Sequence, residues 1–238
     1  MTTAAMKEHA EQRGAELLLH DCHLVLDPSG CLFWSQESLL VVSDLHLEKG
    51  SSFASRRGVL VPPYDTRQTL NQLAQCLDYW QPKTVISLGD SFHDEDASKR
   101  LSTGCRRQLR ELMKGREWVW IYGNHDPSPP EDLGGMYSAQ LQIGNLNFIH
   151  EPKQEFVPGE IAGHLHPCAK IRHRGKSVRR RCLVGDADRL ILPAFGAFTG
   201  GLNIRDEAYN GLFAQDTLRA WLLSGDEVYE IAGKRLVA

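Results

Sequence analysis

Five short polar motifs follow apolar, strand-like runs, and together they hold half of the chain's ten histidines. The motifs are Asp44-Leu45-His46, Gly89-Asp90, Gly123-Asn124-His125-Asp126, Ile149-His150 and Gly163-His164-Leu165-His166. Each alone has an ordinary structural explanation, such as a turn or a hydrogen-bonded histidine at a strand end. Bringing all of them together would be costly unless cations balanced the carboxylates and imidazoles. The set therefore predicts a metal centre.

The donor types indicate which ions and which reaction such a centre would suit. Mixed carboxylate, imidazole and amide ligands favour manganese, iron or zinc over magnesium or calcium. Two such ions about 3.5–4 Å apart can share a bridging hydroxide and clamp a phosphate for in-line displacement. The predicted chemistry is metal-dependent hydrolysis of a phosphoester.

The ordered set D-x-H, G-D, G-N-H-D, H and G-H-x-H resembles the calcineurin-like metallophosphoesterase superfamily, with every element intact between Asp44 and His166. The resemblance implies a first metal held by Asp44, His46, Asp90 and His166, and a second held by Asp90, Asn124, His150 and His164. It also implies that His125 is a catalytic residue, which faces the phosphate and stabilises charge or protonates the leaving oxygen. Asp126 would orient His125, because carboxylates commonly fix imidazole rings.

Further segments resemble a narrower family, the bacterial ligase-associated DNA-damage-response endonucleases of the PdeM type. They are Asp44–Gly50, Pro62–Thr66, Gly89–Asp94, Gly163–Pro167 and Leu192–Gly196. This resemblance implies a manganese-dependent endonuclease that acts on DNA, single-stranded or flexible, in DNA repair. It also implies a functional link to a DNA ligase, a nuclease and a helicase.

Substrate contacts are expected from His93 and from a basic run. His93 follows Asp90 by three residues and could contact the scissile phosphate; the alternative is a hydrogen-bonded loop histidine. The run Lys170–Arg181, with Arg172 and Arg174, directly follows the last predicted ligand. It could give DNA non-specific, salt-sensitive affinity, although basic hairpins are often simply solvated.

The elements that would position these residues alternate in type along the first half of the chain. Helices are expected at Tyr64–Tyr79 and Ser98–Lys114, where apolar residues recur at helical spacing. Strands are expected at Glu16–Asp27, Cys31–Ser35, Ser38–Ser43, Thr84–Leu88, Trp118–Tyr122, Leu146–Ile149, Ile161–Ala162, Cys182–Val184 and Arg189–Leu192. Strand–helix alternation followed by strands predicts an α/β fold: two packed mixed β-sheets flanked by helices, as a four-layer α/β/β/α sandwich.

Composition narrows the class of protein. The chain has 238 residues, 42% hydrophobic and 24% charged, which suits a single domain over 1–238 with a sizeable core. Its net charge of −3 gives no global preference for nucleic acid. Six scattered cysteines, a polar start at Met1–Arg13 and no long apolar run predict a cytoplasmic protein without a membrane partner. A homodimer is compatible with the sequence.

Two other functions compete with the endonuclease. One is a phosphodiesterase or phosphatase that acts on small nucleotides, which the net charge of −3 supports. The other is a non-catalytic metal-binding scaffold of the same fold. Scaffolds tend to lose ligands, whereas this sequence keeps all of them.

Overall fold

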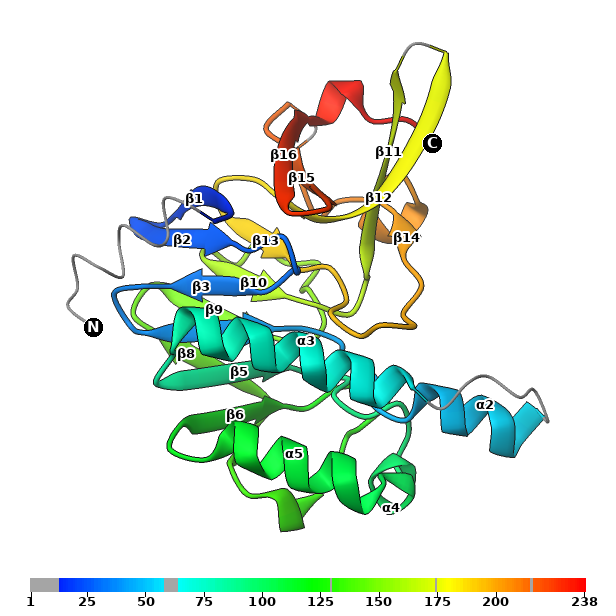
Figure 1. Cartoon of the computed structure of the whole chain (residues 1–238). Helices are drawn as coiled ribbons and strands as arrows, with labels where there is room; N and C mark the ends of the chain where they lie inside the picture. Colours follow the sequence, from blue (N-terminus) through cyan, green and yellow to red (C-terminus); the bar gives the residue numbers. More distant parts are fainter. Residues whose placement is uncertain (1–12, 58–63, 129, 174, 215) are drawn as a thin grey trace.

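The computed structural model describes residues 13–57, 64–128, 130–173, 175–214 and 216–238, and it contains two β-sheets packed face to face (Figure 1). The first sheet has the strand order β1 to β7. Its strands are β1 (Ala15–Leu19), β2 (Cys22–Leu26), β3 (Leu32–Trp34), β4 (Leu39–Val42), β5 (Thr84–Leu88), β6 (Glu117–Ile121) and β7 (Met136–Ser138). Strands β1 to β4 pair antiparallel, whereas β4 to β7 pair parallel. The carboxyl ends of β4, β5 and β6 therefore meet at one edge.

The second sheet is also mixed, with β15 pairing β12 at a branch from the main path. Its strands are β8 (Gln140–Ile143), β9 (Leu146–Ile149), β10 (Glu160–Ala162), β11 (Pro167–His173), β12 (Lys176–Gly185), β13 (Arg189–Ile191), β14 (Leu202–Asn203), β15 (Arg219–Ser224) and β16 (Glu227–Ala232). Strand β10 runs parallel to both β9 and β13. The hairpin of β11 and β12 extends away from the two sheets (Figure 1).

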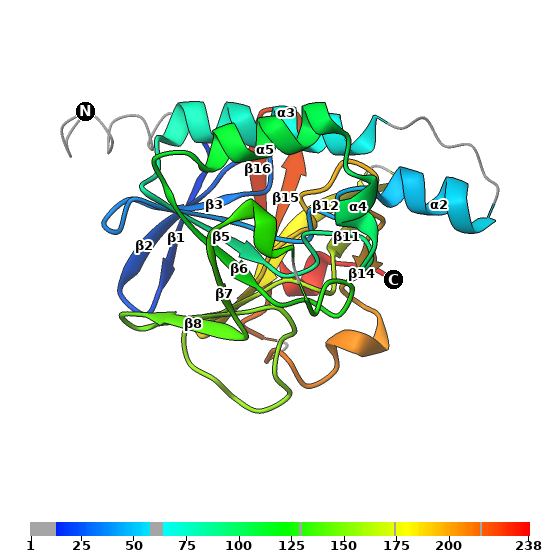
Figure 2. The same cartoon turned by 90° about the horizontal axis from the view of Figure 1, so that it is seen from below.

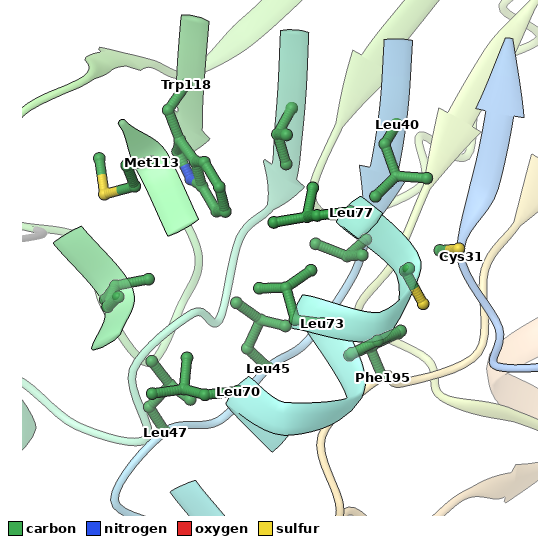
Figure 3. Packing of buried hydrophobic residues seen from close by; sticks show 14 of the residues in the cluster. Cys31, Leu40, Leu45, Leu47, Leu70, Leu73, Leu77, Met113, Trp118 and Phe195 are labelled. Atoms are coloured by element: carbon green, nitrogen blue, oxygen red, sulfur yellow. The ribbon is translucent and has the colours of Figure 1, made fainter. Parts of the chain in front are cut away.

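Two helices, α3 (Asp65–Trp80) and α5 (Thr103–Met113), lie on the outer face of the first sheet (Figure 2). The shorter helices α2 (Lys49–Arg57) and α4 (Ala97–Arg100) lie at the edge where its parallel strands end (Figure 1). Figure 2 shows α3 and α5 side by side over this face. Leu70, Leu73 and Leu77 of α3 are fully buried and share one cluster with Leu40 of β4 and Trp118 of β6. Figure 3 shows Leu77 on the side of these strands and Leu70 beside Leu47. This packing fixes the helices on the sheet that carries the first polar motifs.

A second apolar layer lies between the sheets. Val41, Ile86 and Val119 extend from the first sheet, and Phe148 and Ile161 from the second, into one buried cluster. Because alternate residues of a strand face opposite sides, β4, β5 and β6 bury one set against helices and the other against the second sheet. Strands buried on both faces appear in the sequence as uninterrupted apolar runs, which is how they were recognised.

The predicted fold class, two packed mixed sheets with helices, is confirmed. On the outer face of the second sheet, the described residues form only the 3-10 turn η2 (Glu207–Tyr209) and extended segments, which pack through Tyr209, Leu212 and Phe213. Short 3-10 turns also occur as η1 (Glu131–Leu133) and η3 (Gly233–Arg235). None of the helices in the described ranges has the length and apolar character needed to cross a membrane.

Two predicted elements are each divided in the structure. The expected strand Glu16–Asp27 is the hairpin of β1 and β2, because His20 and Asp21 take positive φ angles of 44° and 63° and turn the chain. The expected helix Ser98–Lys114 is interrupted between α4 and α5. There the Ser102 side chain accepts a hydrogen bond from the amide of Cys105 and caps the start of α5.

Candidate metal centre

Each predicted ligand lies in a loop within a few residues of the strand that precedes it. Asp44 and His46 follow β4, Asp90 follows β5, Asn124 and His125 follow β6, His150 follows β9, and His164 and His166 lie between β10 and β11. The loops after β4 and β5 run side by side, since His46 donates its backbone amide to Asp90 O at 2.9 Å and Leu47 donates to Ser91 O at 2.9 Å. The parallel strands of the first sheet therefore deliver the first three motifs to one place.

The first group of candidate ligands comprises Asp44, His46 and His166, whose donor atoms all lie within 4.8 Å of one another. The Nε2 atoms of His46 and His166 are 3.2 Å apart, and Nε2 of His166 is 3.1 Å from Oδ1 of Asp44. That Oδ1 atom is fully buried and, among the described residues, has no partner in hydrogen-bond geometry. The other carboxylate oxygen of Asp44, Oδ2, accepts hydrogen bonds from the Ser43 hydroxyl and from the backbone amide of His164, the latter at 3.1 Å.

The second group comprises Asp90, His150 and His164, again within 4.8 Å. The Nδ1 atom of His164 is 3.2 Å from Nε2 of His150, which is also 3.0 Å from Oδ1 of Asn124. The carbonyl of Leu88 lies 2.8 Å from Nδ1 of His150 and fixes the ring from behind. Nε2 of His150 therefore faces the other donor atoms.

Asp90 joins the two groups. Its Oδ1 is 3.4 Å from Nε2 of His150, and its Oδ2 is 3.7 Å from Nε2 of His46. The structure thus brings all seven predicted ligands together in the arrangement expected for two ions sharing one carboxylate. Their role as ligands stays a prediction.

Backbone strain is concentrated at this centre. Among the described residues, ten that are not glycine have a positive φ, and five of these are predicted ligands. The five are Asp44, His46, Asp90, His164 and His166, with φ between 43° and 67°. This conformation costs about 1–2 kcal/mol per residue for amino acids with a Cβ atom. Such strain typically marks a functional site, where the surrounding fold enforces it.

Two glycines allow the loops to approach one another. Gly89 has a φ of 70°, and a Cβ atom there would lie 2.5 Å from the ring of His150. A Cβ atom on Gly123 would clash with the backbone and side chain of Asp90. Glycine at these positions is therefore required for the second group to close.

The charges of the centre suit cation binding at neutral pH. Burial raises the pKa of Asp44, but His166, His150 and His46 outweigh it and lower the pKa below its usual value. Burial lowers the pKa of His46 to about 3 and also lowers that of His164. These two imidazoles are therefore neutral and have a lone pair for a metal.

His150 behaves differently because it lies between carboxylates. Burial lowers its pKa, but the hydrogen bond with Asp90 and the charge of Asp44 outweigh burial and raise the pKa to about 9. The side chains of the two groups, buried carboxylates with imidazoles directed between them, fit divalent ions. The clearest sign of this fit is the buried Oδ1 of Asp44, which faces Nε2 of His166 without a hydrogen bond of good geometry.

His125 lies at the rim of the centre and is 41% exposed in its side chain, with Nε2 4.0 Å from Oδ2 of Asp90. Its Nδ1 is 2.9 Å from the backbone carbonyl of His93, and the two rings stack at 5.2 Å. The predicted orientation by Asp126 differs from this geometry. Asp126 is buried and accepts the amide of Phe92 at 3.0 Å, so it holds the loop after Asp90 instead.

Three residues are expected to contact the substrate, and of the two that the structure describes, only His93 lies at the metal centre. There, Nδ1 of His93 is 3.3 Å from Nδ1 of His46. Burial lowers the pKa of His93 to about 4. Arg172 is exposed on β11, six residues beyond His166 and so about 20 Å along an extended strand. Arg174 lies outside the described residues, as do Pro62 and Pro63.

Sequence reasoning missed the supports of the first group. Ser43 holds Asp44, while Glu48 accepts the Thr66 hydroxyl at 2.9 Å and Asp65 accepts the amide of Gly50 at 2.8 Å. These bonds tie the loop after β4 to the start of α3. A polar pair eighteen residues apart leaves no local pattern, so only the adjacency of Ser43 to Asp44 could have been noticed.

A cavity of about 560 Å³ opens beside the second group. Asn124 and His150 form one side of it, and Tyr122 and Lys153 form another. Its size is typical of small-molecule sites. The centre can therefore receive part of a substrate next to the donor atoms.

Comparison with known proteins agrees with this geometry. The sequence matches the family model described as calcineurin-like phosphoesterase over residues 38–223, which include every predicted ligand. No curated protein matches the chain in sequence. The solved structure of Pseudomonas putida nuclease MPE is similar, with 24% identity and a TM-score of 0.68 over 91% of this chain and 99% of that chain. The phosphoesterase Yfce from E. coli gives 14% identity and a TM-score of 0.38 over 82% and 98%.

The family match covers most of the chain, and the nuclease from Pseudomonas putida has the same fold. The chain therefore belongs to the calcineurin-like phosphoesterases and is a metal-dependent phosphoester hydrolase.

Proposed function

We propose that this enzyme is a manganese-dependent DNA endonuclease of DNA repair. The observation that carries the proposal is the pair of ligand groups joined by Asp90, with His125 exposed beside them. A carboxylate shared by two groups suits two ions acting together on one phosphodiester. The similar fold of a Pseudomonas putida protein described as a nuclease supports nucleic acid as the substrate.

The roles of the residues follow from their positions. Asp44, His46, Asp90 and His166 would hold one ion, and Asp90, Asn124, His150 and His164 the other. Such ions, when bound, activate a water molecule and neutralise charge on the phosphate. His125 reaches toward the same place with Nε2, while its Nδ1 faces the His93 carbonyl. Because a carbonyl can only accept, Nδ1 carries a hydrogen, and Nε2 carries one as well only when the ring is the imidazolium. In that form Nε2–H would donate a proton to the leaving oxygen, which is general acid catalysis.

The role of His93 would be to position His125. Its carbonyl and its ring both contact His125, and its Nδ1 faces His46. Because the pKa of His93 is about 4, its ring is neutral at physiological pH and adds no charge to the centre. Direct contact with the scissile phosphate is the further expectation for this residue.

The experiment is a cleavage assay on end-labelled single- and double-stranded DNA and on plasmid, with manganese, magnesium, zinc and iron in turn. We expect cutting within the strand, strongest with manganese, and none by an Asp90→Asn variant. A panel of nucleotides serves as the competing substrate. Turnover of nucleotides without any DNA cutting would overturn the proposal.

A small-nucleotide phosphodiesterase is the second candidate. The cavity of about 560 Å³ beside Asn124 and His150 has the size of a nucleotide site and supports it. The nucleotide panel decides between the two functions. The biological role would be tested separately, by the sensitivity of a deletion strain to DNA damage and by co-purification with a ligase or helicase.

A further inference from the structure

Two adjoining cavities lie outside the metal centre, and the larger of them runs along α3. The larger, of about 1010 Å³, lies between α3, the turn at Pro28 and the turn that joins β15 to β16. The smaller, of about 350 Å³, shares Pro28, Arg181 and Gly225 with it and is bounded by β12 and the loop at Gly200. The turn of the β15–β16 hairpin reaches the layer of α3 (Figure 2). We call the two cavities together the arginine groove.

Arginine dominates the charge of this groove. Its lining contains Arg13, Arg67, Arg179, Arg180 and Arg181, and the sole carboxylate among the lining residues is that of Asp226. Arg13 is paired with Asp27 at 2.7 Å. Within the described residues, none of the other four has a carboxylate within ion-pair distance. With Asp226 counted against these four arginines, the lining of the groove has a net charge of about +3 in a protein of net charge −3.

Of these four arginines, Arg181 gives the strongest indication of an anionic ligand. It is half-buried, and burial lowers its pKa. Its guanidinium donates to the carbonyl of Ala194 at 2.8 Å, a neutral partner. Removing a cation from water without a counter-charge costs free energy. An anion in the groove would offset that cost, so the position of Arg181 indicates an anionic ligand.

Aromatic rings lie at both ends of the larger cavity. Tyr64, 56% exposed, is at the start of α3, and Tyr79 is fifteen residues later, about 22 Å along a helix. Arg67 lies 5.2 Å from the ring of Tyr64, and Arg13 lies 4.6 Å from that of Tyr79. Tyr79 is partly buried, so Tyr64 is the exposed ring. Basic side chains beside an exposed ring are typical of single-strand binding, where phosphates meet cations and bases stack.

The groove is also connected to the metal centre through the backbone. Cys168, which lines the smaller cavity, follows His166 by two residues, about 7 Å of strand. The carbonyl of His166 accepts the amide of Leu202 at 2.9 Å, next to the loop at Gly200. On the other side, Phe195 follows Ala194 and donates its amide to Ser43 O at 2.8 Å. The backbone segments that carry His166 and Asp44 are therefore joined directly to the walls of the smaller cavity.

We propose that the arginine groove holds the single-stranded nucleic-acid segment that flanks the cleaved phosphodiester. The inference rests on the proposed nuclease function and adds a second binding site to it. The phosphates would contact Arg67, Arg179, Arg180 and Arg181, and bases would stack on Tyr64. A cavity of about 1010 Å³ has room for a few nucleotides of one strand.

The test compares two double charge reversals in the full-length protein. Arg67→Glu/Arg180→Glu changes two exposed arginines of the groove. Lys83→Glu/Arg107→Glu changes net charge equally at two exposed residues that line neither cavity. Fluorescence anisotropy measures binding of a labelled twenty-nucleotide single strand over a series of salt concentrations, with chelator present. Thermal unfolding confirms that both variants fold.

For the groove variant, we expect the dissociation constant to rise by about tenfold at physiological salt. The slope of log K against log salt should become shallower by about 1.4, which is ~0.7 for each lost phosphate contact. With manganese, the ratio of kcat/KM for the strand to kcat/KM for bis-p-nitrophenyl phosphate should fall about tenfold. The control variant should match the wild type in all three measurements.

Other results would contradict either the groove proposal or the proposed nuclease function, and the two cases can be told apart. If both variants bind the strand equally well while the wild type still cuts it, the groove proposal is wrong and the proposed function stands. If the wild type hydrolyses bis-p-nitrophenyl phosphate but neither binds nor cuts the strand, the nuclease function itself fails. If the groove variant loses affinity for polyglutamate but not for DNA, the groove serves an acidic protein instead.

Discussion

Asp90 contacts both groups of candidate ligands, so its substitution affects the whole centre. Asp90→Asn keeps the size of the side chain but removes the charge that faces His46 and His150. We expect less bound manganese per chain and at least ~100-fold slower hydrolysis of bis-p-nitrophenyl phosphate. Mass spectrometry of the dialysed protein gives the metal content. Asp96→Asn, on an exposed carboxylate, is the control, and full metal content in Asp90→Asn would refute the shared-ligand assignment.

His125 is expected to act on the substrate and not on the metals. In His125→Gln we expect kcat to fall by ~10²–10⁴, as for loss of a general acid, with unchanged metal content and thermal stability. The exposed His23 on β2 provides the control variant His23→Gln. Loss of metal in His125→Gln would instead place this residue among the ligands.

A variant of Asp126 can separate its observed role, which is to hold the loop after Asp90, from its expected role, which is to orient His125. Asp126 accepts the amide of Phe92 and holds the loop after Asp90, while the His93 carbonyl faces His125. Asp126→Ala should therefore lower the free energy of unfolding by about 1–3 kcal/mol, the cost of an unsatisfied buried amide. Its kcat should fall much less than that of His125→Gln. Denaturant unfolding and steady-state kinetics test both points. Equal losses of kcat in Asp126→Ala and His125→Gln would mean that Asp126 does orient His125.

At the scale of elements, the tight approach of two loops can be tested through glycines. Gly89→Ala and Gly115→Ala both place a Cβ atom at positive φ, at 70° and 76°. Both should lose about 1–2 kcal/mol of stability from backbone strain. Only the Cβ atom at Gly89 would meet His150, at 2.5 Å, whereas at Gly115 nothing lies within 4 Å. We therefore expect weaker manganese binding in Gly89→Ala alone, measured by calorimetry; equal affinities would contradict the steric argument.

The elements that the sequence predicts well are those with one dominant local signal. Strands β4, β5 and β6 are buried on both faces, so they appear as apolar runs, and helix α3 has a regular apolar face. Strands β7, β8, β14, β15 and β16 and the outer part of β12 were not predicted. β12 is largely exposed and basic over Lys176–Arg180, where it pairs with the neighbouring strand β11. Its inner part pairs with β15, which is distant in the sequence.

In the candidate site, the ligands could be predicted from the sequence, but the residues that support them could not. The seven predicted ligands could be named because their ordered motifs resemble those of a known family, and each motif follows an apolar run that the edge of a sheet would bring together. Their supports could not, because the His93 carbonyl, the Ser43 hydroxyl and the positive φ angles depend on loops meeting in space. The arginine groove was also beyond sequence reasoning, since it joins α3, β12 and a β-turn.

At the scale of the whole molecule, the helices and sheets hold the strained loops in place. Leu73 is fully buried between α3 and the first sheet. Leu73→Ala should lower the free energy of unfolding by about 2–5 kcal/mol, as for other large-to-small core changes. The exposed Leu18 on β1 gives a control, Leu18→Ala, which should change it little. Urea unfolding measures both, and equal losses would mean that α3 does not anchor the fold.

Metal binding should also stabilise the whole fold, because the ligands come from both sheets. His150, His164 and His166 belong to the second sheet and its loops, and Asp44, His46 and Asp90 to the first. An ion at ~100 times its dissociation constant adds about 2.7 kcal/mol. For a domain of this size, that raises Tm by roughly 5–10 °C. Differential scanning fluorimetry of chelator-treated protein, with and without manganese, should show this shift in wild type and not in Asp90→Asn; an equal shift in both would place the stabilising ion elsewhere.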